Sequence, residues 1–143
     1  MFLRSNRPRW MLIPSGTFIV VLLMLNGACQ RAANLMEVQR VRSGALDVVL
    51  LSRDGSLHQK DTFAIEFRSA SSGGLVNVGN VRASASMPMP GMPMFGTIDV
   101  RPADAPGRYT ATANLEMTGG WRIALEWDGP GGRSAVTFVG AVQ

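Results

Sequence analysis

The sequence predicts an all-β protein, an immunoglobulin-like antiparallel β-sandwich of about seven strands, preceded by an N-terminal signal or anchor helix. Three observations favour this fold. Short runs alternate between apolar and polar residues with a period of two, and turn segments such as Asp128–Gly132 separate them. No apolar pattern of helical period after residue 44 is long enough for a crossover helix. A small up-and-down barrel is the alternative fold.

Residues 1–28 are typical of an export signal, because arginines precede an apolar run and small residues follow it. Arg4, Arg7 and Arg9 come before Phe18–Leu25, and Cys29 closes the segment. Cys29 is the only cysteine, so the chain cannot form an internal disulfide. Acylation of Cys29 would remove a free thiol from an oxidising compartment.

Three interpretations of this N-terminus remain open. Leu25–Cys29 resembles a bacterial lipoprotein cleavage site, with Asn26 where an aliphatic residue is usual. Ordinary secretion is the second interpretation, and an uncleaved membrane anchor is the third. The apolar stretch Trp10–Leu25 contains Pro14 and Gly16 and is shorter than the roughly 20 residues of a spanning helix. All three place the folded domain outside the cytoplasmic membrane, on the periplasmic side.

Polar residues of mixed charge at 29–44 predict a tether, and 45–143 then form the folded domain. A tyrosine corner is expected at Tyr109, which follows Pro106 and Gly107 at the start of a strand. The alternation predicts strands over seven ranges: 46–51, 62–68, 81–87, 97–100, 109–117, 121–127 and 134–142.

Charge and composition argue against two classes of function. Without residues 1–28 the chain carries eleven basic against ten acidic residues, with no basic cluster to follow phosphates, so no nucleic-acid partner is expected. His58 is the only histidine, and no glycine motif opens a helix to hold phosphates. We therefore expect no enzymatic activity and no catalytic residues.

The segment Met87–Met94 contains four methionines and three prolines in eight residues. Thioether sulfur is a soft, neutral ligand that favours Cu(I) and is not lost as a disulfide in an oxidising compartment. The prolines keep the segment from pairing as an interior strand, and Gly91 permits a chain reversal. The candidate metal ligands are Met87, Met89, Met92 and Met94, with Met117, Trp121 and His58 as additional neighbours.

Two other interpretations of the methionines stay open. Met87 continues the inward stripe of Val81, Ala83 and Ala85, and Met117 extends a second stripe, so both can be core packing. An exposed methionine loop can also be a deformable surface that docks on a transporter or adaptor without any metal.

Five segments stand out along the chain: Phe63–Phe67, Val78–Val81, Met87–Met94, Pro106–Tyr109 and Met117–Trp121. Together they resemble the FixH/YtkA-like family of extracytoplasmic domains over roughly residues 45–143. The resemblance implies an immunoglobulin-like sandwich, found alone or fused to periplasmic adaptor subunits of metal efflux pumps, with relatives associated with assembly of copper-containing oxidases. The loop is also similar to that of periplasmic copper-resistance carriers, whose histidines this chain lacks beyond His58, which leaves Cu(I) as the candidate.

These inferences predict a membrane-tethered, extracytoplasmic Cu(I)-binding accessory domain that acts with a metal efflux system or in copper oxidase assembly. Its expected partners are the membrane, through the N-terminal lipid or anchor, and an efflux-pump adaptor or an oxidase assembly protein. The alternative is a non-metal interaction module that docks through its Met/Pro-rich loop.

Overall fold

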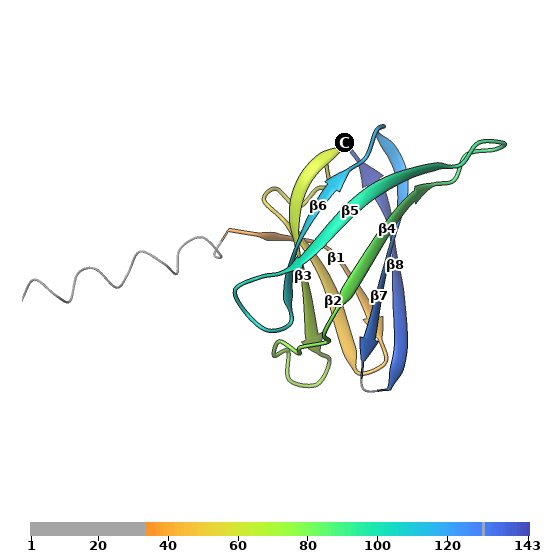
Figure 1. Ribbon diagram of the computed structural model, residues 1–143. Helices are drawn as coiled ribbons and strands as arrows, with labels where there is room; N and C mark the ends of the chain where they lie inside the picture. The colour runs from red at the N-terminus through yellow and green to blue at the C-terminus, as the bar shows by residue number, and fades with distance from the viewer. Residues whose placement is uncertain (1–33, 130) are drawn as a thin grey trace, which may run out of the picture. The chain divides into compact units, whose positions relative to one another are not determined.

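A computed structural model describes residues 34–129 and 131–143, which form eight β-strands and no helix (Figure 1). The all-β prediction is confirmed. The expected N-terminal helix and Cys29 lie outside the described residues, and none of the described segments is a helix able to span a membrane. The strands are β1 (Met36–Ser43), β2 (Leu46–Ser52), β3 (Lys60–Ser69), β4 (Val81–Met87), β5 (Met94–Pro102), β6 (Arg108–Asn114), β7 (Gly119–Gly129) and β8 (Gly132–Val142).

All eight strands belong to one antiparallel sheet in the order β1-β2-β3-β6-β5-β4-β7-β8, which curves until β1 and β8 approach each other (Figure 1). Hairpins connect β4, β5 and β6, and β7 returns to lie beside β4, which is a Greek key. A short ladder of three residue pairs between β4 and β5 joins the two halves of the sheet. The fold is therefore a nearly closed antiparallel sheet of eight strands, and its strand order excludes an up-and-down barrel.

The eighth strand corrects the tether predicted for residues 29–44, because Met36–Ser43 form β1 and pair with β2. Val38 and Val41 both pack against the core although they are three residues apart. A β-bulge between Glu37 and Gln39 absorbs the extra residue. The bulge breaks the period-two alternation, so the sequence pattern does not reveal this strand.

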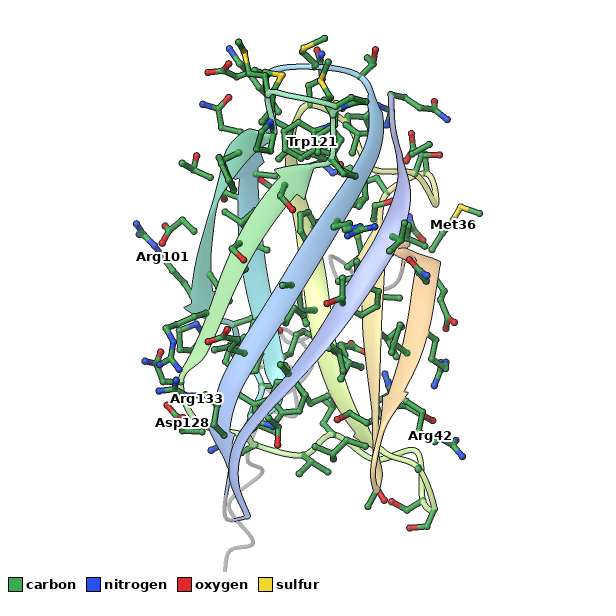
Figure 2. All side chains as sticks on the ribbon, turned by 90° about the vertical axis from the view of Figure 1, so that its right-hand side faces the viewer. Met36, Arg42, Arg101, Trp121, Asp128 and Arg133 are labelled. Carbon is green, nitrogen blue, oxygen red and sulfur yellow. The ribbon has the colours of Figure 1, made fainter. Side chains whose placement is uncertain are left out.

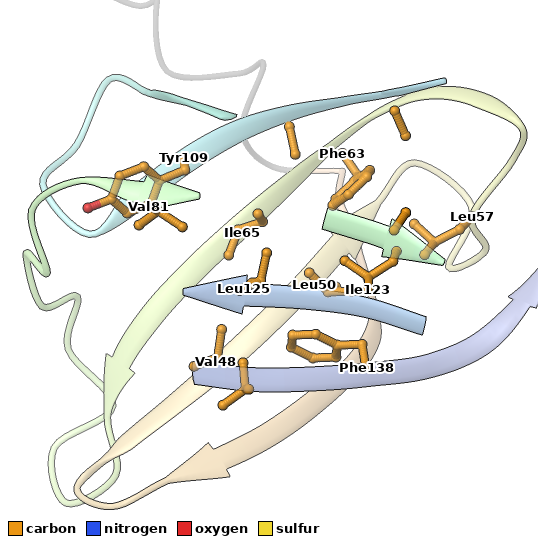
Figure 3. Close-up of a cluster of buried hydrophobic side chains, with 14 of the residues drawn as sticks. Val48, Leu50, Leu57, Phe63, Ile65, Val81, Tyr109, Ile123, Leu125 and Phe138 are labelled. Carbon is orange, nitrogen blue, oxygen red and sulfur yellow. The ribbon is translucent and has the colours of Figure 1, made fainter. Parts of the chain in front are cut away.

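The other seven strands overlap the seven predicted ranges, except that β6 ends at Asn114 and does not reach 117, and their inward residues form one core (Figure 3). Tyr109 is buried, and its hydroxyl donates a hydrogen bond to the Gly79 carbonyl oxygen at 2.6 Å. This bond reaches the loop between β3 and β4, whereas the predicted tyrosine corner would bond to the backbone a few residues upstream. Burial raises the pKa of Tyr109 above its ordinary value. Gly107 has a φ of 86°, and a Cβ there would lie 2.6 Å from the Val76 oxygen, so this corner requires glycine.

Backbone hydrogen bonds hold three chain segments together at one end of the sheet. The Leu115 amide donates to the Gln59 carbonyl at 2.7 Å, and the Gln143 amide donates to the Leu57 carbonyl at 2.9 Å. These bonds join the β2–β3 loop to the β6–β7 turn and to the C-terminus. The β4–β5 hairpin projects from this same end (Figure 1).

Candidate metal centre

The β4–β5 hairpin brings the first and last methionines of the Met/Pro segment together. Met87 ends β4, Met94 begins β5, and the two are direct partners at the end of the ladder. Residues directly opposite in an antiparallel pair have Cβ atoms about 4.5–5.5 Å apart and side chains on the same face. The strand pairing therefore places the Cβ atoms of Met87 and Met94 opposite each other on one face of the hairpin.

The tip of the hairpin brings the other two methionines together. Gly91 has a φ of 80°. A type II turn requires such a positive φ at its third position, directly after the proline at its second position. Met89 and Met92 then occupy the first and fourth positions of the turn, where the Cα atoms lie within about 7 Å. The reversal expected at Gly91 is present, and each arm of the hairpin contributes two sulfurs.

The four methionines differ in accessibility. Met92 is 74% exposed and Met89 is 41% exposed, whereas Met94 packs partly against the core and Met87 is only 7% exposed. The Met87 methyl group lies 3.0 Å from where a Cβ of Gly119 would be, so this side chain packs under the β6–β7 turn. Met87 is thus a core residue, as its alternation with Ala85 predicts, and the ready donors are Met89, Met92 and Met94.

Trp121 supports the base of the hairpin. Its indole Nε1 donates a hydrogen bond to the Met117 carbonyl oxygen at 2.9 Å, and the ring is 1% exposed. Gly96 of β5 permits the close approach, because a Cβ there would lie 3.2 Å from Trp121 Cζ3 and 2.4 Å from Leu115 Cδ2. Figure 2 shows sulfur atoms gathered at the end of the molecule where Trp121 lies, with Met36 apart from them.

Met117 is not the strand residue that the alternation predicts. β6 ends at Asn114, and the chain turns away to reach β7, so the Met117 side chain is 42% exposed. The backbone of Leu115 is bonded to Gln59 of the β2–β3 loop, which ends the ladder before Met117. The Met117 backbone is tied to Trp121, which packs against Gly96 at the base of the hairpin, and its place as an additional neighbour of the site stays a prediction.

His58 is held by a carboxylate. Its Nε2 lies 2.8 Å from Asp54 Oδ2 in the β2–β3 loop, and both side chains are partly exposed. The hydrogen bond with Asp54 raises the pKa of His58, and the same bond lowers the pKa of Asp54. Within residues 34–129 and 131–143, no three His, Cys, Asp or Glu side chains gather as a metal site. The donors at this end are therefore mainly thioethers.

One exposed residue of the hairpin was missed by the sequence reasoning. Phe95 is 73% exposed and follows Met94 directly, so it lies on the opposite face of β5 from the methionine pair. A single aromatic residue in a strand is usually assigned to the core, and only its position next to an inward Met94 marks it as outward. Phe95 gives the hairpin an apolar outer surface.

Comparison with solved structures finds a copper-bound variant of FetP from uropathogenic Escherichia coli strain F11. The TM-score is 0.48 and the sequence identity is 10%, and the match covers 76% of this chain and 97% of that chain. No curated protein matches the chain. The model of the YtkA-like family matches residues 40–126, more than half of the sequence. The chain therefore belongs to the YtkA-like family.

Proposed function

We propose that this chain binds Cu(I) through its β4–β5 hairpin, with Met89, Met92 and Met94 as thioether donors and Met87 as a further donor. One observation carries the proposal: the ladder pairs Met87 with Met94, and the turn pairs Met89 with Met92. Two or three thioethers are sufficient to hold a soft monovalent ion. Neutral sulfur donors need no counter-charge, so they can stand at an exposed hairpin tip.

The proposed role is metal handling without chemical turnover. The exposed arm of Met89 and Met92 allows a bound ion to be approached and exchanged, while Met94 is anchored against the core. We place the domain outside the cytoplasmic membrane, tethered through Cys29 or an N-terminal anchor. There it would serve a metal efflux system or copper oxidase assembly, in contact with an adaptor subunit or an assembly protein. Membership of the YtkA-like family is consistent with this role.

The test is an anaerobic Cu(I) competition titration of the full chain against a chromogenic chelator. The combined Met87→Leu, Met89→Leu, Met92→Leu and Met94→Leu variant keeps size and hydrophobicity and removes sulfur. We expect the native chain to withdraw stoichiometric Cu(I) and the variant to withdraw none. Met36→Leu is the matched control, because Met36 is also exposed but lies on β1. Equal competition by the folded variant and the native chain would refute the hairpin site.

A second function is favoured by the exposed apolar surface at Phe95 and Met92. Here the hairpin docks on a transporter or adaptor protein and binds no metal. The same leucine variant separates the two functions, because leucine preserves an apolar docking surface. Retained docking and loss of Cu(I) binding in that variant would assign both roles to the hairpin, whereas a native chain that binds no Cu(I) would leave docking alone.

A further inference from the structure

The β4–β5 hairpin separates its methionines into an exposed tip and a protected base. Met92 is the most exposed methionine of those that the structure describes, and Met89 is exposed to a lesser degree. Both lie beyond the ladder, because the β4–β5 pairing ends with Met87 and Met94. The Met87 side chain is buried, with its methyl group packed under the β6–β7 turn at Gly119. A chemical change at the tip therefore leaves the strand pairing intact.

Exposed thioethers are the methionine side chains that an oxidant reaches first. Hydrogen peroxide transfers one oxygen atom to the sulfur: the O–O bond breaks, an S–O bond forms and water leaves. The sulfur loses two electrons, and the peroxide gains them. The product is methionine sulfoxide, which is polar, and a thiol-dependent reductase restores the thioether with two electrons and two protons. Because the sulfur lone pairs also bind a soft ion, a bound ion lowers the reactivity of the thioether toward peroxide.

We propose that Met89 and Met92 are sites of reversible oxidation by peroxide, and that their conversion to sulfoxide turns off Cu(I) binding at the hairpin. The switch rests on the proposed Cu(I) site, because it removes the donors of that site. A sulfoxide presents a hard oxygen atom, which suits Cu(I) poorly. Oxidation of the tip removes two of the three ready donors and leaves Met94 with the buried Met87 opposite it.

The protected base allows the hairpin to be oxidised and repaired without unfolding. A sulfoxide at an exposed position costs little, because water hydrates its oxygen. At Met87 the same change would place a polar group in the core, where it would need a hydrogen-bond partner. Burial of Met87 keeps peroxide away from that sulfur. Oxidation is therefore expected to change the metal site and to leave the stability of the sheet nearly unchanged.

Met36 provides an internal reference for the oxidation chemistry. It is 57% exposed, but it begins β1 and lies apart from the sulfur atoms near Trp121 (Figure 2). Without a metal, peroxide should oxidise Met36 about as fast as Met92. A soft ion at the hairpin should slow oxidation of Met89 and Met92 and leave Met36 unaffected.

The first test is peptide mapping of the full chain, in a neutral detergent, during graded treatment with hydrogen peroxide. Parallel samples contain one equivalent of Ag(I), a soft ion that peroxide does not oxidise as it would Cu(I). One tryptic peptide, Ala83–Arg108, contains all four methionines of the hairpin, and its fragment spectra assign each sulfoxide. We expect Met92 to react before Met89, and Met87 to react last. Ag(I) should slow the reaction at the two tip residues about tenfold and have no effect at Met36.

The second test is anaerobic Cu(I) competition on the oxidised chain, after catalase has removed the peroxide. We expect the affinity to fall by about tenfold or more once Met89 and Met92 are converted, and methionine sulfoxide reductases A and B to restore it. The thermal unfolding midpoint should hardly change. Met36→Leu is the matched control, because it removes an exposed thioether outside the hairpin, and it should lose Cu(I) binding on oxidation as the native chain does.

Three outcomes would overturn the switch. Met87 may not be oxidised as fast as Met92, because the division into tip and base would then be absent. Ag(I) must not protect Met36 and Met92 equally, and the Cu(I) affinity must not stay the same after the tip is converted. A native chain that binds no Cu(I) before any oxidant is added refutes the proposed hairpin site and the switch together, so the two failures are distinguishable.

Discussion

The β4–β5 hairpin carries thioethers, and the outer face of β3 and β6 carries a carboxylate between two arginines. Only the hairpin leaves its groups accessible to a ligand. On the outer face, the Glu66 side chain is 3% exposed, and both oxygens accept charged hydrogen bonds, from Arg68 Nε at 2.7 Å and Arg108 Nε at 2.8 Å. At the hairpin, Met89 and Met92 stand in solvent. A buried charge must be paired to be tolerated, whereas a neutral thioether has no such requirement. The charged cluster therefore serves structure, and the hairpin is free to bind.

The largest expected effect is a loss of stability when the charged cluster around Glu66 is disrupted. Glu66→Gln leaves two arginines without their shared carboxylate, and we expect the free energy of unfolding to fall by about 3 kcal/mol. Urea unfolding should show a lower midpoint with an unchanged slope. Cu(I) competition should be unaffected. A Glu66→Gln protein as stable as the native chain would contradict the structural role of the cluster.

The next effect concerns the base of the hairpin. Gly96→Ala forces a Cβ into Leu115 and Trp121, and overpacking of this kind costs about 1–3 kcal/mol. Gly120→Ala is the matched control, because nothing lies within 4 Å of its Cβ position. We expect lower thermal stability and a changed near-UV signal from Trp121 for Gly96→Ala, with little change for Gly120→Ala. If the two variants have the same unfolding temperature, the close packing of Trp121 against β5 is contradicted.

A smaller effect should separate metal binding from packing within the hairpin. Met92→Leu removes the most exposed donor, and we expect Cu(I) affinity to fall about tenfold, which is about 1.4 kcal/mol of binding free energy. Thermal stability should hardly change, because the side chain is 74% exposed. Met117→Leu tests the neighbouring turn in the same assay and should have less influence. Unchanged affinity in Met92→Leu would remove this residue from the ligand set.

The smallest expected effect is a pH dependence of stability, which arises from His58 in the β2–β3 loop. The pKa of His58 is raised by its hydrogen bond with Asp54, so the protonated pair stabilises the fold at pH below the unfolded pKa of about 6.5. This contribution is lost as pH rises through the raised folded pKa. The stability difference between the native chain and His58→Gln should therefore shrink as pH rises from about 6.5 through the raised folded pKa. A difference that is constant over this range would show that the pair has no role in folding.

Strand positions were largely predictable, because burial of one face imposes a period of two. Val81–Met87 has the bounds that its alternation predicts, and the stripe from Trp121 to Trp127 is the inward face of β7. The order in which the strands pair was not predictable, since alternation defines a face and not a neighbour. β1 was assigned to a tether for a different reason: its bulge shifts the alternation by one residue, so the pattern that marks a strand is lost.

The sequence by itself determined the chemistry of the candidate site and its reversal at Gly91, because four sulfurs and a Pro-Gly turn within eight residues are local features. Only the tertiary structure decided which sulfurs are accessible. Met87 is buried because it meets Gly119, and Trp121 reaches the hairpin because Gly96 leaves room for its ring. Such contacts join residues more than twenty positions apart, and they arise when the sheet curves and brings β4, β5 and β7 together.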